Sequence, residues 1–268
     1  MIPLNAASLL FIALTPATSP APFTELPVLE APAQPIVLQD ADVADEPKWT
    51  GSANAGATLN TGNTETVAIA ASIDAELRRA KDRQTIGAYW NYAENDDVTT
   101  GVTSITERKA GADYQYDYFI NEKTYYLANA GARTDDIARL DLRWFAGAGI
   151  GRQIFEEEDH KLSGEVGLVY LEESYETSSD DSEGVSVRVA SSYLKRLTKT
   201  TVFEVDGEIF QSLKEGDDVY GRLDARIRLD VHENLFAMLQ WIIDWDNTPA
   251  SGSTSTDQQI IATLGWGF

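Results

Sequence analysis

The chain has 268 residues, a formal net charge of -22 and no cysteine. Its 43% of apolar and 24% of charged residues are typical of a folded protein, and an all-β barrel of this length is commonly a single domain. The acidic balance argues against a nucleic-acid partner, and the lack of cysteine excludes a disulfide framework, a thiolate metal site and a cysteine nucleophile. Apart from the N-terminus, no window approaches the roughly 18 apolar residues that a membrane helix needs. The chain is therefore either soluble or a membrane barrel.

The N-terminus is typical of an export signal, which we assign to residues 1–21. Ala6–Leu14 (AASLLFIAL) is a short apolar run followed by small residues and prolines. No Lys or Arg precedes it, so the basic region of a signal peptide is missing, and a buried strand or an incorrect start site are the alternatives. Several small-x-small sites between Ala17 and Ala33 suit cleavage.

Residues 22–47 are rich in Pro, Ala and acidic side chains and show no sustained periodicity. This composition predicts a disordered periplasmic linker. The alternative is that Pro35–Leu38 forms a short strand docked in the lumen of the domain that follows.

From Trp49 onward the dominant pattern is alternation of apolar and polar residues, which predicts β-strands. We expect residues 48–268 to form an up-and-down antiparallel β-barrel. Its twelve strands are expected near residues 49–60, 67–78, 84–94, 105–119, 124–134, 140–153, 161–172, 184–196, 201–213, 219–230, 235–246 and 259–268. Each is about as long as a tilted membrane strand of roughly 9–11 residues.

The predicted connections alternate in kind. Tight polar turns are expected at Ala80–Arg83, Asn121–Lys123, Glu156–His160, Thr198–Thr200 and His232–Asn234. Longer acidic or Ser/Thr-rich loops are expected at Glu94–Ser104, Glu172–Glu183 and Asn247–Thr256, with Thr61–Thr64 as a short exception. Short periplasmic turns that alternate with longer external loops are typical of outer-membrane barrels.

Aromatic residues near the strand ends predict two girdles at the membrane interfaces. The periplasmic girdle would contain Trp49, Tyr118, Tyr126, Tyr193, Phe203, Trp266 and Phe268, and the outer girdle Trp90, Tyr92, Tyr170 and Trp245. Packing in a core is the alternative, but it would scatter aromatic residues along the strands.

The face opposite the apolar one is heavily charged. In a soluble barrel these charges would meet water, whereas in a membrane barrel they would line the interior. We expect a ladder of opposite charges between two neighbouring strands, which fits a partly filled lumen better than an open pore. Its members are Glu204, Asp206 and Glu208 on one strand and Arg222, Arg226 and Arg228 on the next.

The last strand ends in alternating apolar residues, Leu264, Trp266 and the terminal Phe268. This ending resembles the signal that the outer-membrane insertion machinery reads. The expected partners are therefore that machinery and outer-membrane lipids, and the expected state is a monomer in the outer membrane of a Gram-negative bacterium.

No convincing catalytic, cofactor-binding or metal-binding constellation is present in the sequence. The histidines, His160 and His232, fall in predicted turns, where solvated roles are expected rather than general-base catalysis. The pairs Asp135–Asp136 and Asp180–Asp181 could hold a divalent cation, but solvated acidic loops are the preferred interpretation. The alternating glycines Gly147, Gly149 and Gly151 are expected on the lumen face of a strand and not in a nucleotide-binding loop.

Four stretches resemble the YdiY-like family of outer-membrane proteins, a domain of unknown function associated with salt induction. They are Gly56–Thr66, Tyr114–Tyr126, Leu140–Gly151 and Gly164–Tyr170. The resemblance covers roughly residues 48–268 and implies fold and location, with no catalytic residues and no substrate. The missing basic region and the long linker depart from the family.

Three functions are open at this point. The preferred one is a non-enzymatic outer-membrane barrel, either a narrow, porin-like channel for small solutes or a structural envelope component linked to salt stress. The alternatives are a hydrolase embedded in a barrel and a soluble secreted β-barrel that binds a ligand.

Overall fold

A computed structural model of the chain describes residues 47–60, 64–97 and 100–268. The expected export signal and almost all of the expected linker lie outside the described residues. Unless stated otherwise, every statement below concerns the described part.

The described chain folds into twelve β-strands. They are β1 (Trp49–Asn60), β2 (Thr64–Arg78), β3 (Asp82–Asp97), β4 (Val102–Phe119), β5 (Thr124–Asp135), β6 (Leu140–Glu156), β7 (His160–Tyr175), β8 (Ser182–Arg196), β9 (Thr201–Ser212), β10 (Val219–His232), β11 (Leu235–Asp246) and β12 (Thr256–Gly267). A single 3₁₀ turn, η1 (Ser178–Asp180), accompanies them. No helix among the described residues has the length and apolar character needed to cross a membrane.

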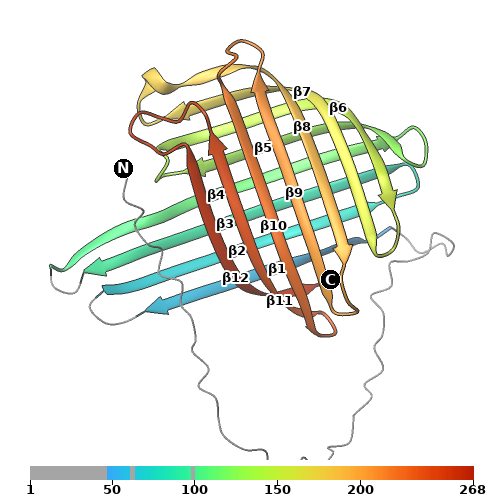
Figure 1. Ribbon diagram of the computed structural model, residues 1–268, viewed down its shortest axis with the longest axis horizontal. Coiled ribbons are helices and arrows are strands. Elements are labelled where there is room, and N and C mark those ends of the chain that lie inside the picture. The colour runs from blue at the N-terminus through green and yellow to red at the C-terminus, as the bar shows by residue number, and fades with distance from the viewer. Residues whose placement is uncertain (1–46, 61–63, 98–99) are drawn as a thin grey trace, which may run out of the picture. The chain divides into compact units, whose positions relative to one another are not determined.

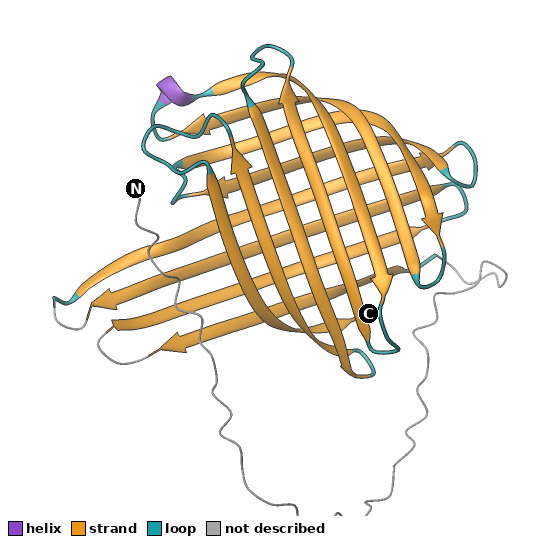
Figure 2. Cartoon of the chain, viewed as in Figure 1, coloured by secondary structure: helices purple, strands orange, loops and turns teal. Residues whose placement is uncertain are grey.

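Each strand pairs antiparallel with its neighbours in sequence, and β12 pairs with β1 to close the barrel. Figure 1 shows the strands following one another in sequence order around the wall, and Figure 2 shows that nearly all of the described chain is strand. The prediction of an all-β, twelve-stranded antiparallel barrel is confirmed.

The connections divide the barrel into two rims. At the turn rim the connections are short, at residues 79–81, 120–123, 157–159, 197–200 and 233–234. The other end, the loop rim, carries the described connections 136–139, 176–181, 213–218 and 247–255. The predicted tight turns all lie at the turn rim.

Two of the loops are shorter than the sequence predicts. The segment Glu94–Ser104 is mostly strand, because β3 continues to Asp97 and β4 begins at Val102. Likewise β7 extends to Tyr175, well into the predicted loop Glu172–Glu183. Acidic and hydroxyl side chains indicate loops in a sequence, but strands that project beyond the rim can carry them on both faces. Asn247–Ser255 does form a long loop, as expected.

The two faces of the wall differ as the alternation predicts. In β5 the inward residues Tyr125, Leu127, Asn129 and Arg133 are buried, while the outward residues between them are exposed. The alternation of Leu140 with Leu142 and Trp144 predicts that all three face outward, but this is wrong for Leu140, which is buried inside the loop rim. A register shift between Leu140 and Leu142 causes this reversal.

Candidate functional site

The barrel interior is bridged by charged side chains, and Arg133 on β5 is the central one. Its guanidinium donates to Glu208 of β9 at 2.7 Å and to the Tyr220 hydroxyl of β10 at 3.1 Å. These partners lie four and five strands away around the wall, so the contacts cross the lumen. Arg133 also donates to Asp113 on the adjacent strand β4 at 3.2 Å. Because Arg133 is 8% exposed, these contacts replace the water that it has lost.

The network continues from Glu208 toward the turn rim. Arg188 donates to Glu208 at 3.1 Å and to Glu165 at 3.0 Å. Gln115 then links Glu165 to Asp117, at 2.8 and 2.9 Å. At its end Arg83 donates to Asp117 at 2.7 Å. Cations and acids therefore alternate along the interior, except where the neutral Gln115 joins Glu165 to Asp117. Each buried charge in this series has a partner.

At the loop rim Arg143 of β6 makes a second contact across the lumen. It forms ion pairs with Glu173 of the adjacent strand β7 and, at 2.7 Å, with Asp246 of β11. Its guanidinium also lies 3.8 Å from the centre of the Tyr220 ring. Since β6 and β11 are five strands apart, this pair spans the barrel.

Aromatic rings fill much of the remaining interior, and glycines on neighbouring strands make room for them. A methyl group at Gly151 would lie 2.3 Å from the Tyr125 ring, directly opposite in register. The same relation holds for three further pairs, Gly131 with Phe145, Gly111 with Tyr89, and Gly265 with Phe236. The predicted lumen placement of Gly147, Gly149 and Gly151 agrees with this, since all three side-chain positions are closed off by neighbouring strand or ring atoms.

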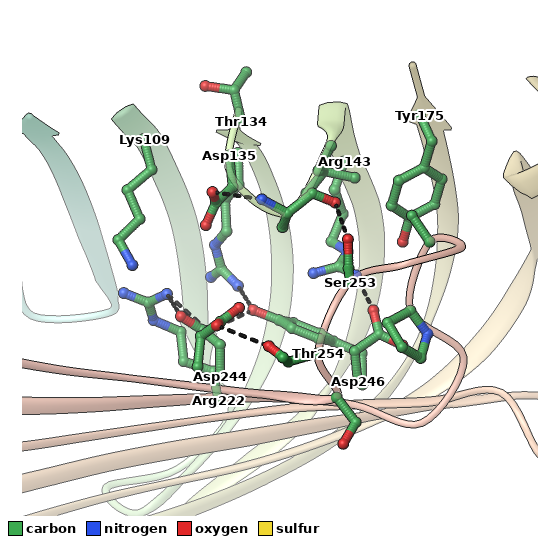
Figure 3. Close-up of a pocket in the computed structure, with 18 of the residues that line it drawn as sticks. Lys109, Thr134, Asp135, Arg143, Tyr175, Arg222, Asp244, Asp246, Ser253 and Thr254 are labelled. Atoms are coloured by element: carbon green, nitrogen blue, oxygen red, sulfur yellow. Dashed lines mark hydrogen bonds and ion pairs between the residues drawn. The ribbon is translucent and has the colours of Figure 1, made fainter. Parts of the chain in front are cut away.

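A cavity of about 60 Å³ lies at the loop rim among these groups. This volume holds only a few water molecules. Figure 3 shows cationic Lys109, Arg143 and Arg222 and acidic Asp244 and Asp246 around it. The cavity is thus polar and of mixed charge.

The β11–β12 loop lies over this cavity and is tied to three other connections. Figure 3 shows its Ser253, whose hydroxyl donates to the carbonyl of Ala138 at 3.2 Å. Ala250 is buried against Leu140 and Tyr175. The loop also bonds to the β7–β8 connection, where Asp180 accepts from the Ser251 amide at 3.0 Å, and to the β9–β10 connection, where Asp218 accepts from the Thr248 hydroxyl at 3.2 Å. Partial burial raises the pKa of Asp218, while this hydrogen bond opposes the shift.

The six residues of the predicted charge ladder face the interior, and only part of the set pairs internally. Arg226 forms ion pairs with Glu204 at 3.8 Å and with Asp206. Arg222 is opposite Glu208 in register but pairs with Asp244 at 2.9 Å, while Glu208 binds Arg133 and Arg188. Arg228 pairs with Asp230 at 2.8 Å and lies over the Phe236 ring.

The predicted interface aromatics lie on the outer face. Seven are exposed: Trp49, Tyr118, Tyr126, Trp266, Trp90, Tyr170 and Trp245. Tyr193 is half-buried between Phe203 and His160. Of the C-terminal residues, Leu264, Trp266 and Phe268 are exposed, and the backbone of Phe268 pairs with Gly51 of β1 through two 2.9 Å bonds.

The loop acids and His160 have structural roles that the sequence did not reveal. Asp135 accepts two backbone amides of its own loop, and Asp136 pairs with Arg108. Asp181 accepts the Tyr175 amide at 2.7 Å. No group of three potential metal ligands occurs among the described residues. His160 begins β7, is half-buried and stacks on Phe155, with 4.9 Å between ring centres.

The turn rim also carries an exposed ion pair. Lys195 donates to Asp159 at 2.9 Å, and this hydrogen bond holds the pKa of the Asp159 carboxyl below its usual range.

Sequence reasoning missed most residues that fill the lumen. Arg133, Arg143, Tyr125 and Tyr220 were not singled out, although they make the contacts across the barrel. A signal was available for Tyr125 alone, which lies opposite Gly151 in the strand register, because an aromatic residue across from a glycine is a favourable cross-strand pair.

Three solved structures show a distant similarity to this chain, at low sequence identity. The porin NanC matches with a TM-score of 0.47 and 6% identity, over 82% of this chain and 98% of that chain. The translocator domain of the autotransporter NalP from Neisseria meningitidis gives 0.40 and 8%, over 82% and 86%. A mutant of the monoaromatic hydrocarbon channel TodX gives 0.38 and 8%, over 84% and 90%.

No curated protein matches the sequence. The profile of one family, described as "Protein of unknown function, DUF481", matches residues 53–268. The chain therefore belongs to the DUF481 family.

Proposed function

We propose that this protein is a non-enzymatic outer-membrane β-barrel that forms a narrow conduit for small solutes, closed at rest by side chains that cross its lumen. The observation that carries the proposal is the inverted polarity of the wall. Arg and acidic residues pair inside, whereas large apolar residues such as Leu168, Ile209 and Leu239 are exposed outside. An apolar surface that surrounds a barrel would be unstable in water but is what lipid requires.

The contacts across the lumen support a narrow conduit and not a wide pore. Arg133 and Arg143 each reach strands four or five positions away around the wall. A solute moving through the lumen would therefore have to displace these ion pairs. The mixed charges of the cavity at the loop rim favour small polar or zwitterionic solutes over ions of one sign.

The membrane placement is tested by fractionation and by gel migration without heating. We expect the protein in the outer-membrane fraction, with an unheated form that migrates differently from the denatured chain. A chain that stays soluble without detergent and migrates at its denatured mass would leave the soluble ligand-binding barrel as the explanation.

The conduit is tested with Asp246→Asn in planar bilayers. The substitution removes the charge that Arg143 reaches across the barrel, but leaves the pair of Arg143 with Glu173 and an acceptor for the Thr248 amide. We expect discrete currents whose conductance is higher in the variant than in the native chain. Glu158→Gln, in the exposed β6–β7 turn, removes the same charge at the other rim and should leave conductance unchanged.

A structural role in the envelope is the second candidate, and the small volume of the cavity favours it. Absence of current from both the native chain and Asp246→Asn would select it and reject the conduit.

The proposal also includes four expectations that the described residues do not test. These are an export signal at 1–21, a periplasmic linker at 22–47, a monomeric state and recognition of Leu264, Trp266 and Phe268 by the insertion machinery. The link to salt stress rests on the YdiY-like resemblance alone, and unchanged expression after a shift to high salt would remove it.

A further inference from the structure

The barrel closes unevenly, and the short seam lies between β1 and β12. These strands are in register over four residue pairs, from Ser52–Gly267 to Ala55–Leu264. Every other pair of neighbouring strands is in register over at least 11. Figure 1 shows β1 and β12 meeting near the C-terminus and separated at their loop-rim ends.

Two strand edges are left without strand partners by this separation. They are Ala57–Asn60 of β1 and Thr256–Ile261 of β12, each paired on its other side only, with β2 and β11, whereas Gly56 still lies against Ala262. The paired part of the seam, extended by the bonds between Gly51 and Phe268, covers about 17 Å of strand at roughly 3.3 Å per residue, or about 13 Å along the barrel axis at a usual tilt. This is about half of the roughly 25 Å apolar band of a membrane barrel.

The sequence of both edges is suited to a closed seam. Extending the observed register would place Leu59 opposite Ile260, both outward. These are the two most exposed large apolar residues of the described chain, at 73% and 72%. Unpaired backbone in lipid costs several kcal/mol for each group, so closure along this register is favoured when lipid surrounds the seam.

A polar contact inside the barrel links the loop-rim half of β12 to β3 and β4. The side chain of Gln259 accepts from Asn91 of β3 at 3.1 Å and donates to Glu107 of β4. It thus reaches past both β1 and β2 to the strands that follow them. Gln259 would face Asn60 if the register continued, so this contact and a closed seam compete for the same strand.

We propose that the β1–β12 seam is a lateral gate, which Gln259 holds open and through which amphipathic molecules pass between the lumen and the surrounding lipid. The proposal rests on the membrane placement proposed above.

The chemistry on the two sides of the gap identifies the class of molecule. Leu59 and Ile260 flank the gap outside, whereas Asn91, Glu107 and Gln259 lie behind it. A molecule with an apolar chain and a polar head would keep the chain in lipid and place its head among these hydrogen-bonding groups. A purely polar solute would gain nothing from the apolar flanks.

The two states of the gate are tested by spin labels on Leu59→Cys and Ile260→Cys in liposomes. The chain has no cysteine, so no other site would be labelled. Pulsed EPR should show a long-distance population from the open seam and a short one from the closed seam, in which Cβ atoms would be about 5 Å apart. Adding Gln259→Ala should enrich the short population, while Gln258→Ala, on the exposed neighbour, should not.

Either of two results would overturn the gate. One is a single distance in all variants, whether short or long. The other is a distribution that Gln259→Ala and Gln258→Ala change equally. Failure of the protein to float with the liposomes would instead contradict the membrane placement itself, so the two failures are distinguishable.

Passage is tested with a diazirine-bearing fatty acid in the same liposomes. We expect photolabelling of peptides that carry Thr58 and Asn91, falling about tenfold when the Leu59→Cys/Ile260→Cys pair is oxidised and recovering on reduction. The control pair Leu223→Cys/Ile243→Cys joins directly opposed residues of β10 and β11 and should have no effect. Labelling that is absent from these peptides, or that oxidation of the seam leaves unchanged, would reject lateral passage.

Discussion

The part of the barrel around β5 to β10 and the seam between β1 and β12 differ in how far their neighbouring strands pair and in how the interior beside them is filled. In the first region strands are in register over at least 11 pairs, and the interior is bridged by Arg133 and its partners. At the seam four pairs remain, and a single polar side chain, Gln259, crosses to the far strands. Full strand pairing accompanies a filled interior, whereas the short seam leaves two strand edges without a partner strand. The packed interior and the seam that we propose as a gate thus lie in different parts of one sheet.

Charge reversal at Arg226→Glu is expected to have the largest effect on the filled interior. It would place a carboxylate beside Glu204, Asp206 and Asp224, all of which Arg226 now contacts. The free energy of unfolding should fall by about 3–5 kcal/mol, as for a broken buried ion pair. Urea unfolding followed by the heat-dependent gel shift measures it.

Lys199→Glu is the control for this variant, because it reverses a charge in the exposed β8–β9 turn. Equal stability of the two variants would show that the interior pairs contribute nothing beyond net charge.

Gly151→Val should have an intermediate effect in the packed wall. Its first side-chain atom would lie 2.3 Å from the Tyr125 ring, which is fully buried and hydrogen-bonded to Glu165. Overpacking of this kind costs about 1–3 kcal/mol. Gly164→Val on β7 is the matched control, since the nearest atom there is 3.9 Å away. A stability loss no larger than that of the control would mean that the ring can move freely.

Gly56→Val tests the same substitution at the seam and should have the smallest effect on stability. A side chain here would lie 2.4 Å from the carbonyl oxygen of Ala262. Because β1 and β12 already part beyond this point, the edge should yield, and the loss should stay below about 1 kcal/mol. Faster amide hydrogen exchange at Ala262 and Thr263, with unchanged exchange in β5 and β6, would report the widened seam. A loss as large as that of Gly151→Val would show that the seam is as rigid as the wall.

The sequence by itself determined the number of strands, the order in which they pair and the face that most of their residues take. These follow from local alternation and from turn positions, which depend on residues close together in the chain. The facing of Glu204 to Glu208 and of Arg222 to Arg228 could therefore be predicted.

Only the tertiary structure decided which acidic and basic side chains form ion pairs inside the barrel. Arg222 lies opposite Glu208 in register yet pairs with Asp244, and Glu208 is taken by Arg133 from across the lumen. Such partners depend on the diameter and shear of the closed barrel, which the alternation of one strand does not contain. The same holds for Leu140, which a register shift turns inward, and for the length of the β1–β12 seam. Both result from how twelve strands close on one another, and not from the preference of any single strand.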